Sequence, residues 1–265
     1  LGLLRLHHLP EFYKVKGFEI PAAIVGGGPD LKNNLEELKK FKTIFACGSV
    51  HDYLIENNII PTYATVCDPD PVGINYFQKP HTEVKYLISS GCDPRFFEHL
   101  KNYPTVMWHC HSDDFVPEEI EKDYQAVGGG CTIGLRAISI AIMLGYSNLH
   151  FFGFDSCLSG TETGYSYDLS TQEEKNNQGI SYKIKIGMQS EGKPREEKEY
   201  FCLGYHLAQV EHFKMFYATY HEYFVPTFHG KGLLPDFVKM IQTEEKIKRE
   251  NASKEAILTP LKEAV

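Results

Sequence analysis

Two glycine clusters stand beside helical patterns in this sequence. Gly26-Gly27-Gly28-Pro29-Asp30 follows a short apolar segment, and Gly128-Gly129-Gly130-Cys131-Thr132 precedes the apolar segment Ile133–Leu144. Glycine lets a ligand approach the backbone closely, and the free N–H groups at the start of a helix attract anions, so both clusters suit a phosphate group. Neither cluster has the G-x-G-x-x-G or Walker spacing, which argues against ordinary dinucleotide binding and P-loop hydrolysis. A tight turn is the alternative for the first cluster, and the second cluster makes that alternative weaker.

Acidic residues follow two other apolar segments. Asp68 and Asp70, in Asp68-Pro69-Asp70-Pro71, could hold Mg²⁺ on a triphosphate, because Mg²⁺ prefers hard oxygen ligands. They could equally cap backbone N–H groups in a turn, and the residues leave both possibilities open. Asp155, in Gly153-Phe154-Asp155-Ser156, could accept a hydrogen bond from a ribose or sugar hydroxyl, with a capping role as its alternative.

Histidines and isolated cations complete the reactive side chains. Of twelve histidines, His206 comes just before a helical pattern and after a polar stretch, and imidazole titrates near the pH at which enzymes work. We therefore consider His206 as a general base, with a surface or core histidine as the alternative and Asp168 as the substitute base. Arg136 and Lys231 are the cations expected nearest an anionic ligand, and His229 could also touch a phosphate.

The composition excludes several classes of protein. The chain has 265 residues, of which 42% are hydrophobic and 23% charged, and this is typical of a globular protein. The net charge of −8 argues against a general nucleic-acid binder. No apolar run approaches the roughly 18–20 residues that cross a bilayer, and the first ten residues lack the pattern of an export signal. Seven scattered cysteines without a CxxC pair favour a reducing cytoplasm.

Six apolar, β-rich segments alternate with helical patterns. They are Ala22–Val25, Thr43–Cys47, Tyr63–Cys67, Val84–Ile88, Thr105–Trp108 and Leu149–Phe152. This alternation predicts an α/β fold, a Rossmann-like, mostly parallel sheet with helices on both faces. In such sheets ligands bind beyond the carboxyl ends of the strands, where the strand order reverses. The first glycine cluster, Gly48-Ser49, Asp68 and Asp155-Ser156 all fall at these ends.

The pattern of strands and helices is interrupted by a polar stretch. We expect Leu158–Tyr200 to lack regular structure and to form a lid-like insertion that is mobile until a ligand binds. C-terminal helices are predicted over Leu203–Tyr220 and from Asp236. The predicted organisation is an N-terminal extension over residues 1–20, one α/β nucleotide-binding transferase domain over residues 21–242, and a charged tail over residues 243–265.

Six motifs in matching order resemble a known family. They are Ile24-Val25-Gly26-Gly27-Gly28-Pro29, Ala46-Cys47-Gly48-Ser49, Val66-Cys67-Asp68-Pro69, Gly129-Gly130-Cys131-Thr132-Ile133-Gly134-Leu135-Arg136-Ala137, Leu144-Gly145-Tyr146 and Phe152-Gly153-Phe154-Asp155-Ser156. Together they resemble the 6-hydroxymethylpterin diphosphokinase-like (MptE-like) domain, a family that includes motility accessory factors that glycosylate flagellin. More remotely, the glycine loop, Leu-Gly-Tyr and Gly-x-Asp resemble bacterial sialyltransferases that use a CMP-activated sugar.

The resemblance implies a nucleotide pocket and a transfer reaction. Its nucleotide-binding residues would be Gly26, Gly27, Gly28, Pro29, Asp30, Gly48, Ser49, Asp68, Gly129, Gly130, Cys131, Thr132 and Ser156, with His206 and Asp155 as catalytic residues. His206 lies near the position of the base in the sialyltransferase pattern. One departure is Gly164-Tyr165-Ser166-Tyr167-Asp168, where many relatives carry a His-Ala-Tyr-like element. Hydroxyls of Tyr165, Tyr167, Tyr182 or Tyr205 would assist the departing phosphate.

Three functions follow as hypotheses. The first is a glycosyltransferase that takes a nucleotide-activated sugar, a CMP-linked nonulosonic acid being one such donor, without an obligatory metal. The second is an Mg-ATP-dependent 6-hydroxymethylpterin diphosphokinase, with Mg²⁺ on Asp68 and Asp70. The third is a non-catalytic nucleotide- or glycan-binding module. The expected partners are a nucleotide or nucleotide-sugar donor and an acceptor that the sequence does not identify, with no nucleic acid and no membrane span; oligomer formation is left open.

Overall fold

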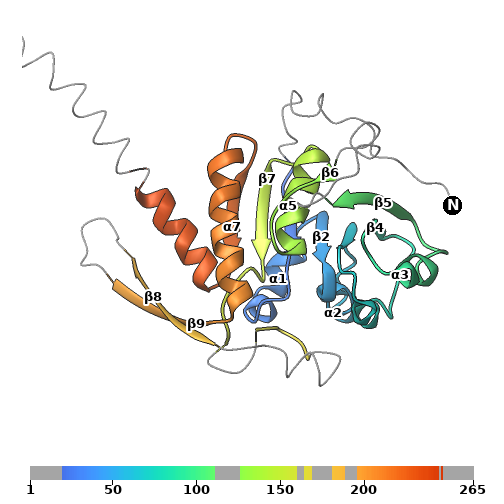
Figure 1. Cartoon of the computed structure of the whole chain (residues 1–265), viewed down its shortest axis with the longest axis horizontal. Coiled ribbons are helices and arrows are strands. Elements are labelled where there is room, and N and C mark those ends of the chain that lie inside the picture. The colour runs from blue at the N-terminus through green and yellow to red at the C-terminus, as the bar shows by residue number, and fades with distance from the viewer. Residues whose placement is uncertain are drawn as a thin grey trace, which may run out of the picture.

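The computed structural model describes residues 20–110, 126–159, 164–168, 181–188, 196–244 and 246, and it contains an eight-stranded parallel sheet. The strands lie in the order β10-β7-β1-β2-β3-β4-β5-β6 (Figure 1). Their bounds are β1 Ala22–Val25, β2 Thr43–Cys47, β3 Tyr63–Val66, β4 Lys85–Ser89, β5 Thr105–Cys110, β6 Ala126–Val127, β7 Asn148–Phe152 and β10 Val225–His229. The predicted α/β class and mostly parallel sheet are confirmed. The two-residue strand β6 is too short to leave a periodic signal in the sequence.

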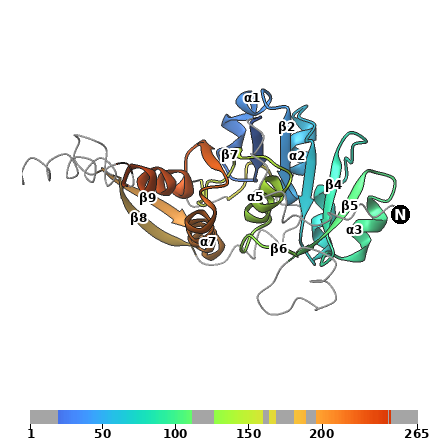
Figure 2. The same ribbon diagram turned by 90° about the horizontal axis from the view of Figure 1, so that it is seen from above.

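Helices cover both faces of the sheet. The α-helices are α1 Leu35–Leu38, α2 His51–Glu56, α3 Pro94–His99, α5 Ile133–Met143 and α7 Gly204–Tyr220, with 3₁₀ turns at Leu31–Asn33, Gly48–Val50 and Pro71–Tyr76. Residues 233–244 are also helical, so this helix begins at Leu233, three residues before the predicted start at Asp236. Figure 2 shows α1 and α2 on one side of the sheet and α5 and α7 on the other.

Strand β1 is the centre of the molecule because its side chains supply both cores. Ala22 and Ile24 pack in the cluster under α5 and α7, whereas Ala23 and Val25 pack in the cluster under α1, α2 and α3. All four residues are completely buried, as expected for a strand covered on both faces. β1 pairs with β2 on one side and with β7 on the other. The direction in which strands are added reverses between β1 and β7, so the ligand crevice of such folds is expected at their carboxyl ends.

The expectation that Leu158–Tyr200 lacks regular structure is wrong in its second half. Strands β8 (Tyr182–Met188) and β9 (Glu196–Cys202) form an antiparallel hairpin, and the alternation of lysine with apolar residues over Tyr182–Ile186 is typical of a half-buried strand. Lys198 Nζ donates to Asp236 Oδ2 at 2.9 Å, and Tyr200 donates to the same carboxylate. These contacts attach the hairpin to the helix at residues 233–244, which lies to the left of α7 in Figure 1 with the hairpin below it.

Other predicted regions fall largely outside the described residues. This applies to residues 1–19 of the N-terminal extension, to residues 160–163, 169–180 and 189–195 of the lid-like insertion, and to all but the beginning of the tail. Within the part of the chain that the structure describes, no helix has the length and apolarity needed to cross a bilayer.

Candidate functional site

The loops that follow β1 and β7 are joined backbone to backbone. Gly26 N donates to Phe152 O and Gly28 N donates to Gly153 O, both at 2.9 Å. A Cβ atom on Gly26 or Gly28 would lie 2.7 Å from Gly153 O, and a Cβ on Gly153 would lie 2.4 Å from Gly26 O. Gly26 and Gly28 must therefore lack a side chain, because the loop after β7 lies directly against them. We refer to this contact between residues 26–28 and Gly153 as the β1–β7 seam.

Gly27 is required by a different neighbour, the segment Gly164–Asp168. A Cβ on Gly27 would lie 2.3 Å from the hydroxyl of Tyr167. Ser166 makes two hydrogen bonds to the glycine loop. Its N–H donates to Gly27 O at 2.9 Å, and its hydroxyl donates to Gly28 O at 2.6 Å. Tyr167 forms a 2.6 Å hydrogen bond with Ser49. Residues 164–168, which we call the tyrosine strap, thus cover the glycine loop in this structure.

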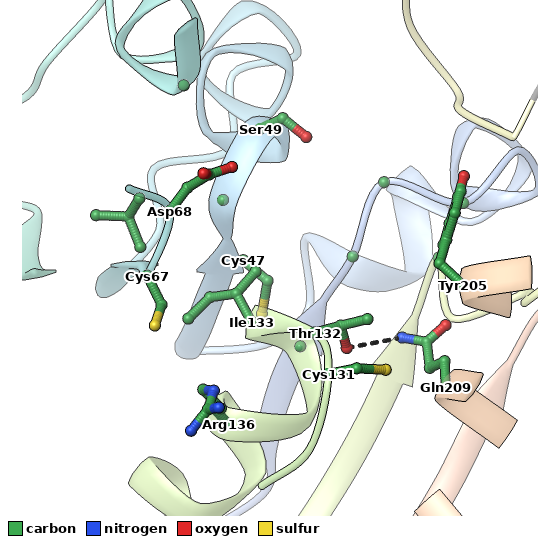
Figure 3. Close-up of a pocket in the computed structure, with 18 of the residues that line it drawn as sticks. Cys47, Ser49, Cys67, Asp68, Cys131, Thr132, Ile133, Arg136, Tyr205 and Gln209 are labelled. Carbon is green, nitrogen blue, oxygen red and sulfur yellow. Dashed lines mark hydrogen bonds between the residues drawn. The ribbon is translucent and has the colours of Figure 1, made fainter. Parts of the chain in front are cut away.

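A cavity of about 610 Å³ opens at the carboxyl ends of the strands beside the seam. The predicted site residues that line it are Gly26, Gly27, Gly28, Gly48, Ser49, Asp68, Cys131, Thr132, Ser156 and His206. The predicted residues Pro29, Asp30, Asp70, Gly129, Gly130 and Asp155 are not part of its wall. In Figure 3 the start of α5 lies between Cys67 and Arg136 on one side and Tyr205 and Gln209 on the other. Ten predicted residues from six separate parts of the sequence therefore meet at one cavity.

The start of α5 faces this cavity. Thr132 caps the helix, since its hydroxyl accepts the N–H of Leu135 at 3.3 Å and its carbonyl accepts the N–H of Arg136. Ile133 and Gly134, the first two residues of the helix, line the cavity. The geometry of an α-helix leaves their N–H groups without a helix carbonyl to bind. These two amides are suited to an anionic group of a ligand.

A hydrogen-bonded chain fixes the position of this helix start. Gln209 on α7 donates through Nε2 to Thr132 Oγ1 at 3.2 Å, which Figure 3 shows as a dashed line. The same side chain accepts the hydroxyl of Ser156 through Oε1 at 2.7 Å. Gln209 lines the cavity but carried no signal in the sequence, because a glutamine within a helix has no characteristic spacing. The chain connects the loop after β7, helix α7 and helix α5.

Gly129 and Gly130 of the second glycine cluster pack against α5 and α7 outside the cavity wall. A Cβ on Gly129 would lie 2.7 Å from Arg136 Cα, and one on Gly130 would lie 2.9 Å from His212 Cβ. Cys131 N donates to His212 Nδ1 at 2.9 Å. His212 on α7 therefore helps to hold the segment before α5 in place.

Asp155 is buried beneath the glycine loop, with only 1% of its surface exposed. Its Oδ2 accepts the N–H of Asp30 at 2.6 Å, and its Oδ1 has no hydrogen-bond partner among the described residues. Asp30 in turn accepts the N–H of Lys231 at 2.9 Å. Burial raises the pKa of the Asp155 carboxyl to about 7. In this position Asp155 holds the glycine loop against the loop that carries Lys231, and its predicted contact with a sugar hydroxyl stays a prediction.

Asp68 and Asp70 accept backbone N–H groups within a turn, which is the alternative to metal binding that the sequence left open. Asp68 Oδ1 accepts the N–H of Asp70, and Asp70 Oδ1 accepts the N–H of Val72, each at 2.9 Å. Among the described residues no group of three His, Cys, Asp or Glu side chains could hold a metal ion. Asp68 still lines the cavity. If Mg²⁺ binds here, most of its oxygen ligands must come from phosphate and water, as is common for this ion.

His206 lines the cavity with only 4% of its surface exposed. Its Nδ1 accepts the N–H of Leu203 at 3.1 Å. A backbone amide can only donate, so the proton of the neutral ring lies on Nε2. Burial lowers the pKa of His206 to about 4, which keeps the ring neutral near pH 7. The geometry therefore suits Nε2–H as a hydrogen-bond donor and not as the general base that the sequence predicts.

Some of the tyrosines and cations that the sequence predicts near the ligand line the cavity, and others lie elsewhere. Tyr165, Tyr205 and Arg136 line the cavity. Tyr182 is exposed on the hairpin, and the hydroxyl of Tyr167 is bonded to Ser49. His229 forms a 2.8 Å hydrogen bond with His150 and does not line the cavity. The apolar part of the wall, which includes Val66, Val72, Tyr76 and Phe77, had no signature in the sequence because apolar residues at strand ends are usual in any core.

Comparison with known proteins gives a family and a fold. The family model described as 6-hydroxymethylpterin diphosphokinase MptE-like matches residues 3–161. The solved structure of a MAf glycosyltransferase from Magnetospirillum magneticum AMB-1 is similar, with a TM-score of 0.55 and 16% sequence identity over 88% of this chain. The match covers 38% of that chain, so this sequence spans well under half of its length. At this identity the likeness shows the fold alone. No match was found among curated proteins.

The contact between Gly27 and Tyr167 gives a double-mutant prediction. Gly27→Ala should lower the free energy of unfolding by about 1–3 kcal/mol, the usual cost of overpacking, because the new methyl group meets the Tyr167 hydroxyl. Tyr167→Phe removes that hydroxyl, so the same Gly27→Ala change should cost measurably less in this background. Tyr165→Phe is the matched control and should give no relief, since its ring carbon Cδ1 is the atom near Gly27. Urea unfolding of the six proteins decides this, and equal costs in all backgrounds would refute the contact.

The buried Asp155 carboxyl predicts a pH-dependent stability. An unfolded aspartate loses its proton near pH 4, whereas folded Asp155 retains its proton up to a pKa of about 7. Folding therefore takes up a proton between these values, and this group makes the protein less stable as the pH rises from 4 to 7. Asp155→Asn cannot titrate, so the variant should gain stability relative to the parent by on the order of 3–4 kcal/mol over this range.

The measurement is urea unfolding of both proteins at several pH values between 4 and 8. His206 acts in the opposite direction, since its lowered pKa makes the fold more stable as the pH rises from 4 to 6.5. His206 is present in both proteins, so its effect cancels in the difference. Two stability curves that stay parallel from pH 4 to 7 would show that Asp155 is ionised in the fold.

Proposed function

Because the chain belongs to the 6-hydroxymethylpterin diphosphokinase MptE-like family, we propose that it is a nucleotide-dependent transferase with its donor bound in the cavity beside the β1–β7 seam. The reaction we favour is glycosyl transfer from a nucleotide-activated sugar, with a CMP-linked nonulosonic acid as the first donor to test. The similar fold of the MAf glycosyltransferase supports this choice over the other reactions of the family. The acceptor is a hydroxyl group on a molecule that enters from the open side of the cavity.

The observation that carries the proposal is the start of α5 in the cavity wall. Ile133 and Gly134 line the cavity at the start of α5, where their N–H groups have no helix carbonyl to bind and the positive end of the helix dipole lies. Arg136, one turn further along the same helix, also lines the cavity, and its Nη1 donates to Val127 O at 3.0 Å. It is the one Lys or Arg side chain among the described residues that line the cavity. This arrangement suits the phosphate of a nucleoside monophosphate better than the larger negative charge of a triphosphate.

Cleavage of the donor needs hydrogen-bond donors at the departing phosphate. In glycosyl transfer the acceptor oxygen bonds to the sugar carbon, and the bond from that carbon to the phosphate oxygen breaks with its electron pair on the nucleotide. His206 Nε2–H and the hydroxyls of Tyr165 and Tyr205 are the side-chain donors on the strap side of the cavity. Donors fixed in a partly buried site stabilise the developing negative charge without a metal ion.

The acceptor proton must then pass to another group, because His206 Nδ1 is already occupied by Leu203 N–H. Asp68 is the one carboxylate among the described residues that line the cavity, and its Oδ2 is not used by the turn to Asp70. We assign Asp68 as the base to test first and exposed Asp168 on the tyrosine strap as the second.

A diphosphokinase is the alternative that the family description favours. In that reaction ATP binds with Mg²⁺, and Asp68 at the cavity wall would hold the ion together with phosphate oxygens and water. A non-catalytic nucleotide- or glycan-binding module is the third candidate, because the same fold can bind a ligand without converting it.

Ligand-induced stabilisation separates these functions. A thermal-shift panel of CMP, CDP, UDP, GDP and ATP, with Mg²⁺ or with EDTA, should show stabilisation by CMP in both conditions, of roughly 2.7 kcal/mol at 100 times its dissociation constant. Stabilisation by ATP that EDTA abolishes would favour the diphosphokinase. Binding of CMP without release of CMP from any nucleotide-sugar would favour the binding module. Absence of stabilisation by every nucleotide would contradict all nucleotide-dependent proposals.

The helix amide of Ile133 can be removed without a change of charge. Ile133→Pro deletes the N–H group at the first helical position, where proline is well tolerated and where Thr132 already has the extended conformation that proline requires before it. We expect CMP to bind about tenfold more weakly, ~1.4 kcal/mol, because a charge-assisted hydrogen bond is lost. Ile133→Val is the matched control, since it shortens the side chain and keeps the N–H group.

Calorimetric titration of both variants with CMP, together with their unfolding temperatures, gives the result. Equal CMP affinities in two folded variants would place the phosphate away from the start of α5.

A second pair of variants tests the guanidinium group of Arg136. Arg136→Gln should weaken CMP binding, and Arg95→Gln on α3, where Arg95 pairs with Asp93 on the surface, should not.

A further inference from the structure

The donor-binding and leaving-group roles proposed above leave out one polar side chain of the cavity wall, that of Gln209. It lies on α7 three residues after His206, so both side chains project from one face of the helix. Figure 3 shows Gln209 beside the start of α5, with its amide nitrogen turned toward Thr132. Gln209 therefore lies next to the helix start at which we place the phosphate.

Hydrogen bonds fix the direction in which the Gln209 amide points. Its Oε1 accepts the hydroxyl of Ser156 at 2.7 Å, and its Nε2 donates to Thr132 Oγ1 at 3.2 Å. An amide nitrogen carries two protons, and these contacts use one of them. Within the described part of the chain no group accepts the second N–H. Because the side chain lines the cavity, this N–H is left for a ligand.

The Thr132 hydroxyl is restricted in a complementary way. Its Oγ1 accepts the N–H of Leu135 at 3.3 Å as well as the Nε2–H of Gln209. A hydroxyl oxygen has two lone pairs, so these two bonds use both of them. The hydroxyl proton has no acceptor in the part of the structure that is described, and Thr132 lines the cavity. Toward a ligand this hydroxyl can therefore act only as a donor.

Ser156, at the other end of this Ser156–Gln209–Thr132 bridge, has an uncommon backbone conformation. Its φ is +50°, in the left-handed region that favours glycine, and only 4% of its surface is exposed. Such conformations persist where the surroundings fix them, and they cluster at ligand sites. The Ser156 hydroxyl is thereby held where it donates to Gln209 and orients the amide.

We propose that Gln209 binds the phosphate of the ligand directly and is a specificity-determining residue of the cavity. Its second N–H, the hydroxyl proton of Thr132 and the Nε2–H of His206 form a set of side-chain donors that includes no acceptor. An ionised phosphate oxygen only accepts hydrogen bonds, so it matches this set. The proposal rests on the proposed function, because it places the phosphate of the nucleotide at the start of α5.

Charged variants at position 209 distinguish contact with the phosphate from a structural role. Gln209→Glu has no proton to donate at neutral pH and adds a negative charge beside the phosphate, so CMP should bind at least about tenfold more weakly. Gln209→Lys supplies a cationic donor and should bind CMP within about threefold of the parent or more tightly. Both variants break the bridge, because lysine cannot accept from Ser156 and glutamate cannot donate to Thr132. A merely structural role would therefore make both variants bind CMP more weakly, to a similar degree.

The measurement is calorimetric titration of CMP into the full chain and its variants, with urea unfolding to establish that each is folded. Gln209→Met removes the amide without adding a charge, and its affinity should fall between those of the lysine and glutamate variants. Gln242→Glu and Gln242→Lys are the matched controls, because Gln242 is exposed on the helix at residues 233–244 and does not line the cavity. They should bind CMP as the parent does. Equal affinities of the three position-209 variants, or a lysine variant weaker than the glutamate variant, would overturn the contact.

The same series with inorganic phosphate separates this proposal from the proposed function. Binding of phosphate without binding of CMP would contradict the nucleotide-dependent function, and a decrease in phosphate affinity from the lysine to the methionine to the glutamate variant would still uphold the contact. Binding of CMP with equal affinity across the series would uphold the function and overturn the contact. Absence of binding of either ligand to the parent would overturn both.

Discussion

The arrangement of the site depends on one close contact, the backbone packing of the glycine loop on Gly153. Strand β1 lies between β7 and β2, where the order in which strands are added to the parallel sheet reverses, so the loops after β1 and β7 lie side by side at the switch point. They can do so only because residues 26, 28 and 153 have no Cβ atoms, which would otherwise lie within 2.4–2.7 Å of backbone oxygens. The seam also determines where Asp155 lies, because Asp155 follows Gly153 and accepts the N–H of Asp30 from beneath the glycine loop. Every other part of the site is placed relative to this junction.

The β1–β7 seam gives the glycines of the first cluster a structural role in packing. A glycine cluster between a strand and a helix suggests phosphate binding, yet each glycine of the first cluster already has a protein neighbour that requires it. Gly27 in particular admits Tyr167, whose hydroxyl is bound to Ser49. The capacity for an anion therefore lies mainly at α5, where Thr132 and Gln209 fix the helix start. Gly26, Gly27 and Gly28 line the cavity beside the tyrosine strap, and contact of the nucleotide phosphate with them stays a prediction.

The sequence was sufficient for the fold and for the edge of the sheet that carries the site, because both follow from short-range patterns. Strand β1 and the carboxyl-terminal position of Asp68 could be read from apolar runs and the turns that end them. Roles that depend on long-range contacts could not be read in this way. The tautomer of His206 is set by a hydrogen bond from Leu203, and the burial of Asp155 is set by loops far away in the chain. In the β8–β9 hairpin, Tyr182–Ile186 carries the alternation of a half-buried strand, but its partner begins with four charged residues, Glu196–Glu199, that have no apolar alternation, so the pairing could not be read from the sequence.

The most direct test of this account is a crystal structure of the protein with CMP bound. The account predicts that the phosphate oxygens lie within hydrogen-bond distance of the N–H groups of Ile133 and Gly134, with Arg136 beside the ligand and the seam between Gly26 and Gly153 unchanged. A CMP phosphate bound elsewhere on the protein, or a seam that opens to admit it, would contradict the central claim that the junction of β1 and β7 positions helix α5 to bind the nucleotide.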